Sequence, residues 1–350
     1  MAESSNWTHL HAQVHRTLLY RQILPSNQRL LIAVSGGQDS LCLIKLLLDL
    51  QPKWGWNLAI VHCDHRWRSD SQASANHVEQ LAKNWGISYY LETASEISKT
   101  EAAARKWRYQ ALTEIAIAHN YPYIVTGHTA SDRAETLLYN LIRGSGADGL
   151  SALTWTRPLL DFRLGNSDEN LKSKIYLVRP LLEITRSQTG QFCQEQKLPI
   201  WEDSTNQDLQ YTRNRIRSEL LPYLETHFNP KAQQALAQTA ELLRADVEYL
   251  ELAASDLLQR AMSPIADTLQ VNFQLPVKLN RRILREAPLA LQRRAMRQLL
   301  QQILPSAPSF ESVEKLTSLI VAPNRSQTDP FPGGAIGRVE HPSIILHIKF

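Results

Sequence analysis

The sequence has few cysteines and no long apolar run. Its three cysteines, Cys42, Cys63 and Cys193, lie far apart and form no Cys-x-x-Cys pair. This argues against a zinc knuckle or an iron–sulfur cluster and for a reducing compartment. No apolar stretch approaches the ~18 residues that a membrane helix requires, and the polar first residues lack the apolar segment of a signal peptide. We therefore expect a cytoplasmic protein with no membrane partner.

The sequence also lacks a strong excess of either charge. Its formal net charge is +4 over 350 residues, a balance typical of globular proteins, and this length favours two or three domains. We place one boundary near Leu221–Pro222. Residues 1–221 are then expected to form one domain, and 222–350 a mainly helical second domain with a short terminal β-hairpin.

Short continuous apolar runs alternate with helix-spaced patterns in the first part of the chain. Such runs suit strands that are buried on both faces of a parallel sheet. The repeated strand–helix order predicts an open, doubly wound α/β fold with a mostly parallel sheet. Strands are expected at 30–34, 58–63, 87–91, 123–126 and 175–178, and helices near 39–50, 71–85, 101–119 and 131–143. Later helices are expected from 230, over 283–304 and from 310.

Polar motifs follow four of the predicted strands. These motifs are Ser35-Gly36-Gly37, Asp64-His65, Gly127-His128 and Arg179-Pro180. Open parallel sheets bind ligands at the carboxyl ends of their strands. One shared site explains the four motifs better than four separate coincidences.

The stretch Ser35-Gly36-Gly37-Gln38-Asp39-Ser40 joins the first strand to the next helix. Glycines let the backbone approach a ligand closely, and a helix N-terminus offers unpaired N–H groups and a positive dipole end. The stretch is neither a Walker A loop nor a Gly-x-Gly-x-x-Gly fingerprint. Two glycines alone would indicate only a tight turn. With serines on both sides and Asp39 inside, phosphate binding is the better interpretation.

Three further stretches carry candidate site residues: VHCDHRWRSDS (61–71), TEAAARKWRY (100–109) and TGHTASDRAETLLYNLIRGSGADGLSAL (126–153). In the last of these, helical spacing places Asp132, Glu135 and Arg143 on one polar face. Each residue taken alone also has a simpler structural interpretation. Acids favour the first turn of any helix, and lone arginines are usually solvated surface charges.

In this order and combination, the loop and the three stretches resemble the tRNA(Ile)-lysidine synthetase family of PP-loop ATP pyrophosphatases. The resemblance covers about residues 28–224 and weakens beyond them. It implies that residues 35–40 bind ATP, with Mg²⁺ near Asp39 and its ligands left open. The family joins L-lysine to ring position 2 of the wobble cytidine of tRNA(Ile) with a CAU anticodon, through an adenylated base. AMP and pyrophosphate leave, codon reading changes from AUG to AUA, and tRNA identity changes from methionine to isoleucine.

A lysine substrate presents one carboxylate and two amines to its site. Arginine forks suit the carboxylate and acidic groups suit the amines, so the resemblance assigns Arg105 and Arg108 to the first and Asp132 and Glu135 to the second. The ε-amine must lose a proton before it attacks, and Asp132 or His128 is the candidate base. The family-like stretch 61–71 adds Asp64 and His65 as active-site support.

Two residues depart from the family pattern. The stretch after Gly127-His128 usually reads Thr-Ala-Asp-Asp-Gln-Ala-Glu-Thr, and here Ser131 replaces the first Asp and Arg133 replaces the Gln. Asp132 and Glu135 remain, so the proposed lysine site is complete. The role of the missing carboxylate is open.

Several arginines are candidate contacts to the phosphates of a tRNA. They are Arg143, Arg213, Arg215 and Arg217, with a further basic stretch at 281–297 for which a solvated helix face is an equal alternative. The oligomeric state is left open, with a homodimer as one option.

Three other functions compete with this interpretation. A tRNA thiolase of the same superfamily would generally use paired cysteines, which are absent here. An ammonia-using synthetase would share only the loop at 35–40. A non-catalytic RNA-binding protein would not need the intact loop, and it would release no pyrophosphate in the presence of tRNA.

Overall fold

The computed structural model of the chain describes residues 7–67, 70–97, 100–159, 175–201, 209–262 and 276–348. It forms two compact units, Met1–Leu242 and Leu243–Phe350. The division falls inside helix α10 (Ala232–Ala261), later in the chain than the boundary expected near Leu221–Pro222. The physical reason is that residues 221–242 contribute Leu221, Leu236 and Ala240 to a core of the first unit.

The first unit contains a six-stranded sheet with the order β3-β2-β1-β4-β6-β5. All neighbouring strands are parallel except β5, which runs antiparallel to β6 at the edge. The predicted doubly wound, mostly parallel fold is confirmed. The strands are β1 (Arg29–Ala33), β2 (Asn57–Asp64), β3 (Ser88–Thr93), β4 (Tyr123–Thr126), β5 (Thr156–Pro158) and β6 (Tyr176–Val178).

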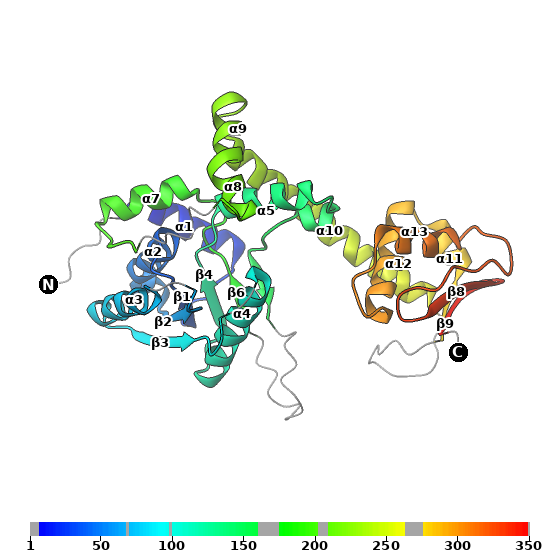
Figure 1. The fold of residues 1–350 in the computed structure, drawn as a ribbon, viewed down its shortest axis with the longest axis horizontal. Helices are drawn as coiled ribbons and strands as arrows, with labels where there is room; N and C mark the ends of the chain where they lie inside the picture. Colours follow the sequence, from blue (N-terminus) through cyan, green and yellow to red (C-terminus); the bar gives the residue numbers. More distant parts are fainter. Residues whose placement is uncertain are drawn as a thin grey trace. The chain divides into compact units, whose positions relative to one another are not determined.

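Helices cover both faces of this sheet (Figure 1). Alternate residues of β1 show the division, because Leu30 and Ile32 join the core formed with α1, α2, α3 and α7, whereas Leu31 joins the core formed with α4. The helices are α1 (His9–Arg21), α2 (Gln38–Trp54), α3 (Ser71–Trp85), α4 (Glu101–Ala118), α5 (Ala130–Ile142), α6 (Ala147–Leu150) and α7 (Arg186–Glu195). Strands buried on both faces need continuous apolar runs, as the sequence predicted.

A third core of the first unit lies around α5. Ala134, Leu137 and Leu138 of α5 pack with Ile216 and with the residues from 221–242 named above. Three short helical segments carry the chain there: α8 (Thr212–Arg215), the π-helix η2 (Ile216–Leu220) and α9 (Leu221–His227). Short π-helical segments are uncommon and often occur at functional sites.

The second unit combines helices with a three-stranded antiparallel sheet of order β7-β9-β8. The expected terminal hairpin is present as β8 (Ala335–Glu340) and β9 (Ser343–Ile348), and β7 (Val277–Asn280) adds an unexpected strand. The helix expected over 283–304 is wrong in one respect, since it is two helices, α11 (Arg281–Glu286) and α12 (Leu289–Ile303). Pro288 disfavours helical backbone at Ala287, whose ψ is 150°. Helix α13 (Phe310–Ser318) begins where expected.

Among the described residues, none of the helices is both long enough and apolar enough to span a membrane.

Candidate active site

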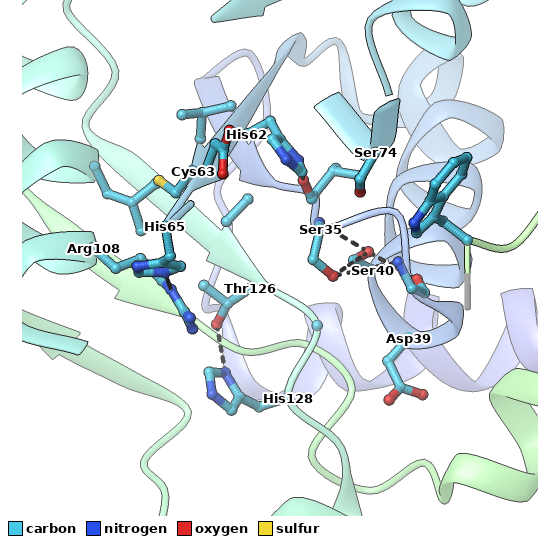
Figure 2. Close-up of a pocket in the computed structure, with 18 of the residues that line it drawn as sticks. Ser35, Asp39, Ser40, His62, Cys63, His65, Ser74, Arg108, Thr126 and His128 are labelled. Carbon is cyan, nitrogen blue, oxygen red and sulfur yellow. Dashed lines mark hydrogen bonds between the residues drawn. The ribbon is translucent and has the colours of Figure 1, made fainter. Parts of the chain in front are cut away.

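A cavity of about 440 Å³ opens at the carboxyl ends of β1, β2 and β4. The strand order reverses between β1 and β4, and such a switch point is where open α/β sheets bind ligands. Figure 2 shows Ser35, Asp39 and Ser40 on one side of the cavity and His65, Arg108 and His128 on the other. Three of the four polar strand-end motifs therefore meet in one place, whereas the fourth, Arg179-Pro180, is not among the residues that line the cavity.

The loop between β1 and α2 is closed by its own serines. Ser40 Oγ accepts a hydrogen bond from Ser35 N (3.2 Å) and donates one to Gly37 O (2.8 Å). Gly36 has a φ of +85°, and a Cβ there would lie 3.3 Å from Trp201 Cβ, so glycine is needed. Gly37 caps α2 without a side chain. The unpaired N–H groups of the first turn of α2 are then left to bind phosphate.

Asp39 and Gln38 connect this loop to α7. Gln38 Nε2 donates to Arg186 O (2.6 Å) and Thr189 Oγ1 (2.8 Å), so the Gln38 side chain holds α7. Asp39 accepts a hydrogen bond from Thr189 Oγ1 and lies 3.5 Å from Arg186 Nη1. Burial raises the pKa of Asp39 against the opposing charge of Arg186. A cation bound beside Asp39 would favour its ionised form.

Asp64 is the last residue of β2 and His65 follows the strand, and their side chains make different contacts. Asp64 is buried and accepts from Arg66 N (2.7 Å) and Ser71 Oγ (3.2 Å), so it closes the turn into α3. His65 Nε2 accepts a hydrogen bond from Arg108 Nε at 2.9 Å, and its ring packs against Trp107 at 4.7 Å between centroids. Because Arg108 donates to it, Nε2 is unprotonated.

The pH dependence of folding is expected to include a contribution from His65. Burial, reinforced by the charge of Arg108, lowers the pKa of His65 from 6.5 to about 4. Between these values the unfolded chain binds more protons than the folded chain, so this contribution to stability is lost as the pH falls from 6.5 towards 4. Urea unfolding at pH 7.5 and pH 5 should show a smaller pH-dependent loss for His65→Asn than for the wild type. The exposed His9, changed to Asn, is the control, and a loss identical in His65→Asn and the wild type contradicts the assignment.

His128 follows β4 and hydrogen bonds through Nδ1 to Thr126 Oγ1 (2.9 Å). Burial, reinforced by the charge of Arg179, lowers the pKa of His128 to about 3. Its imidazole is therefore neutral near pH 7. Gly127 beside it allows β4 to approach α2, since a Cβ there would lie 2.9 Å from Asp39 O.

Asp132 and Glu135 project from the first turns of α5 and share one arginine. Arg217 of η2 binds Glu135 in a bidentate pair, Nε to Oε1 at 2.6 Å and Nη2 to Oε2 at 2.8 Å. The same guanidinium makes a longer contact of 3.4 Å to Asp132 Oδ1, while Asp132 Oδ2 accepts from Thr129 N (2.7 Å). The Glu135 side chain is only 5% exposed. The structure thus brings Arg217, expected at a tRNA-binding surface, to the two acids.

The two departures from the family pattern both contact α10. Ser131 Oγ donates to Gln233 Oε1 (2.6 Å) and accepts from Arg186 N (3.1 Å). Arg133, 2% exposed, pairs with Glu241 at 2.9 Å. These side chains fasten α5 to the first part of α10, so the substitutions have a structural role.

The remaining arginines expected at a tRNA surface form two groups, one at positions 143–215 and the other in the 281–297 stretch. Arg143 Nη1 donates to Tyr139 OH (2.5 Å), and Arg213 lies over the same ring at 5.2 Å while pairing with Glu101. Arg215 is exposed. In the 281–297 stretch, Arg293 pairs with Glu314, and Arg294 and Arg297 pair with Glu251. These partners neutralise part of that stretch.

Several residues of the site could not be identified from the sequence. They are Tyr109, Arg157, Arg186, Thr189 and Trp201, which line the cavity or contact residues that do. Tyr109 is buried and the adjacent Arg108 is exposed, so the two side chains lie on different faces of α4. Burial alone would raise the pKa of Tyr109, but the charges of Arg105, Arg179 and Arg157 together lower it.

Comparison with known proteins agrees with this geometry. The family described as PP-loop domain matches residues 8–224. The U34-tRNA thiolase NcsA from Methanococcus maripaludis has a similar fold, with a TM-score of 0.53 at 17% identity, covering 67% of this chain and 77% of that chain. At this identity the likeness concerns the fold alone.

Two curated relatives match almost the whole chain. A tRNA(Ile)-lysidine synthase from Nostoc sp. is 66% identical over 344 residues, which is 97% of this chain and 97% of the relative. A tRNA(Ile)-lysidine synthase from Synechocystis sp. is 52% identical over 334 residues, 95% of this chain and 96% of the relative. With the PP-loop match and the geometry above, these similarities show that the chain belongs to the tRNA(Ile)-lysidine synthase family of ATP-binding PP-loop ligases.

Proposed function

We propose that this enzyme joins L-lysine to ring position 2 of the wobble cytidine of tRNA(Ile) with a CAU anticodon, releasing AMP and pyrophosphate. The change converts codon reading from AUG to AUA and tRNA identity from methionine to isoleucine. The observation that supports it most is the cavity in which the 35–40 loop faces His128 and Asp132 across the switch point of the sheet.

The first step is adenylation of the base. The ring carbonyl oxygen attacks the α-phosphate of ATP and pyrophosphate leaves. Residues 35–40 supply N–H donors for the phosphate oxygens, on which negative charge accumulates. These donors are fixed before the reaction by the Ser35–Ser40 contacts.

Mg²⁺ fits beside Asp39. Magnesium is usually bound by one or two carboxylates together with substrate phosphates. Among the described residues there is no group of three His, Cys, Asp or Glu able to hold a metal, and we assign Asp39, the carboxylate within the phosphate loop, as the protein ligand that would act with the phosphates. When bound, the ion would neutralise charge on the leaving pyrophosphate.

In the second step the lysine ε-amine attacks carbon 2 and AMP leaves. Glu135 is fully engaged by Arg217, whereas Asp132 Oδ1 makes only the 3.4 Å contact. We therefore assign Asp132 Oδ1 to bind the ε-amine and accept its proton. His128, whose pKa is about 3, is a much weaker base and is better suited to orient substrate.

The tRNA is proposed to contact Arg143, Arg213 and Arg215, with further contacts from the C-terminal unit. Because Arg215 is exposed, Arg215→Glu is expected to weaken tRNA binding and lower the slope of log K against log salt by about 1 to 2. Titrations with labelled tRNA at several salt concentrations measure this. Arg16→Glu, an exposed arginine of α1, is the control, and equal slopes for the two variants contradict the assignment.

Labelled lysine tests the proposed function directly. The enzyme is incubated with ATP, Mg²⁺ and a tRNA(Ile) transcript bearing CAU, beside a transcript with U at the wobble position. Incorporation into the CAU transcript alone is expected. Pyrophosphate release without incorporation would overturn the choice of nucleophile, and release of neither product would indicate a non-catalytic RNA-binding protein.

A further inference from the structure

A groove of about 410 Å³ runs along one face of the continuous helical segment formed by α8, η2 and α9. Its lining residues are Thr212, Arg215, Ile216, Glu219, Leu220 and Tyr223. Their spacing of three and four positions places them on one side of a helix. Figure 1 shows α9 projecting away from the sheet of the first unit. Every residue that lines the groove belongs to this segment, so no other described element covers it.

The groove has an apolar floor and an exposed aromatic wall. Ile216 is buried and Leu220 is half-buried, whereas Tyr223 is 54% exposed. The Tyr223 ring packs against Phe228, itself 72% exposed, at 5.8 Å between ring centroids. Neighbouring apolar side chains that stay exposed on the surface of a folded protein are typical of an interaction site. The planar rings indicate a ligand with a flat face that stacks on them.

Arg215 and Glu219 place opposite charges along the same groove. Both side chains are exposed, and their spacing of four positions makes them neighbours on the helix surface. A phosphate alone would be attracted by Arg215 and repelled by Glu219. A whole nucleotide presents a phosphate to the guanidinium and the edge of its base, which carries hydrogen-bond donors, to the carboxylate. The groove therefore fits a nucleotide better than it fits a free anion.

Arg217 connects this segment to the active site. It belongs to η2, as Glu219 does, and its guanidinium binds Glu135 and Asp132. Asp132 lines the cavity at the carboxyl ends of the strands. One short helical segment thus contacts the cavity on one side and carries the groove on another. The nucleotides next to a base that reacts in the cavity are joined to it by single phosphodiester links, so they have to bind close by.

We infer that the groove binds the base of a nucleotide that flanks the wobble cytidine, by stacking on Tyr223. The inference rests on the proposed function for the identity of the RNA. A base that enters an enzyme cavity must first leave the stack formed with its neighbours. The neighbouring base is then exposed on one face, and the Tyr223 ring replaces the lost stacking partner. The groove thereby stabilises the form of the tRNA in which the wobble base is extruded.

Tyr223→Ala is expected to weaken binding of the CAU transcript about 10- to 100-fold, because a base loses its stacking partner. The slope of log K against log salt should stay unchanged, since no phosphate contact is lost. Tyr223→Phe retains the ring and should bind as the wild type does. Tyr20→Ala is the matched control, because Tyr20 is 84% exposed on α1 and does not line the groove. Titrations with labelled transcript at several salt concentrations measure these affinities.

Transcripts that lack one base locate the contact. An abasic residue is placed either on the 5′ side or on the 3′ side of the wobble cytidine. With one of the two transcripts the wild type should bind more weakly, and Tyr223→Ala should bind no more weakly than the wild type. A full effect of Tyr223→Ala on both transcripts overturns the inference, as does normal binding of the intact transcript by Tyr223→Ala. A lower salt slope for Tyr223→Ala would mean that Tyr223 acts on a phosphate contact, which also overturns it.

Two further outcomes separate this inference from its alternatives. If Tyr223→Ala turns a wild-type dimer into a monomer in sedimentation while it binds tRNA normally, the groove holds a second copy of the chain and the inference is overturned. The binding measurements need neither lysine nor ATP. If the wild type transfers no lysine but shows the Tyr223 and abasic effects, the proposed function fails while the base-binding groove stands.

Discussion

Asp39→Asn is expected to lower tRNA-dependent pyrophosphate release about a thousand-fold, while the affinity for tRNA stays unchanged. Loss of one fixed electrostatic contact to a transition state typically costs 10²- to 10³-fold, and this variant also removes the carboxylate that lies within the phosphate loop. Asparagine has nearly the same shape and still accepts the hydrogen bond from Thr189. Release is measured with the CAU transcript, and affinity by filter binding.

Asp49→Asn is the matched control for this experiment. Asp49 lies on the same helix and pairs with Lys45 and His11, but it is absent from the cavity lining. Its replacement should affect stability and leave pyrophosphate release nearly normal. Equal losses of release in the two variants would mean that α2 is disturbed as a whole, and a loss of tRNA binding by Asp39→Asn would make the loop structural.

Arg217→Gln is expected to lower the free energy of unfolding by about 3 kcal/mol, because it leaves Glu135 buried without its bidentate partner. The rate of lysine transfer should also fall about 100-fold, since Arg217 holds the two acids in place. Urea unfolding and single-turnover transfer measure the two effects. Pyrophosphate release should change less than transfer does.

The double variant Glu135→Gln/Arg217→Gln separates the energy of the Glu135–Arg217 ion pair from the other effects of each substitution on stability. Removing both charges avoids the uncompensated carboxylate, so the double variant should lose less stability than the sum of the single variants. Arg260→Gln breaks a pair whose side chains are 62% and 67% exposed and should cost less than about 0.5 kcal/mol. Additive losses at Glu135 and Arg217 would contradict a coupled pair.

The apolar pattern predicted most strands of the first unit but not β5, the strand at one edge of its sheet. Leu30–Val34 and Tyr123–Thr126 are buried on both faces, so their continuous apolar runs indicate parallel strands. Strand β5 has three residues and ends in Pro158, and only its pairing with β6 makes it a strand. Strand β7 likewise depends on β9, some 65 residues later. Such pairings are tertiary and leave no local pattern in the sequence.

The candidate site was predictable where residues follow strand ends. Topology alone brings the 35–40 loop and His128 together. The partners of individual side chains were not predictable, because Arg217 and Glu135 are 82 residues apart and Asp39 and Thr189 are 150 apart. Basic composition suggested a nucleic-acid surface for Arg217, whereas the structure pairs it with Glu135 and Asp132.

The contacts of Ser131 with Gln233 and of Arg133 with Glu241 bear on how this enzyme can be recombined with its relatives. Both residues flank Asp132, and both depend on a helix that begins a hundred positions later. A chimaera that receives α5 from a relative with Asp and Gln at these positions would leave Glu241 without Arg133 and place a new carboxylate beside Gln233. The two helices therefore form one unit of exchange, and they would have to be transplanted together.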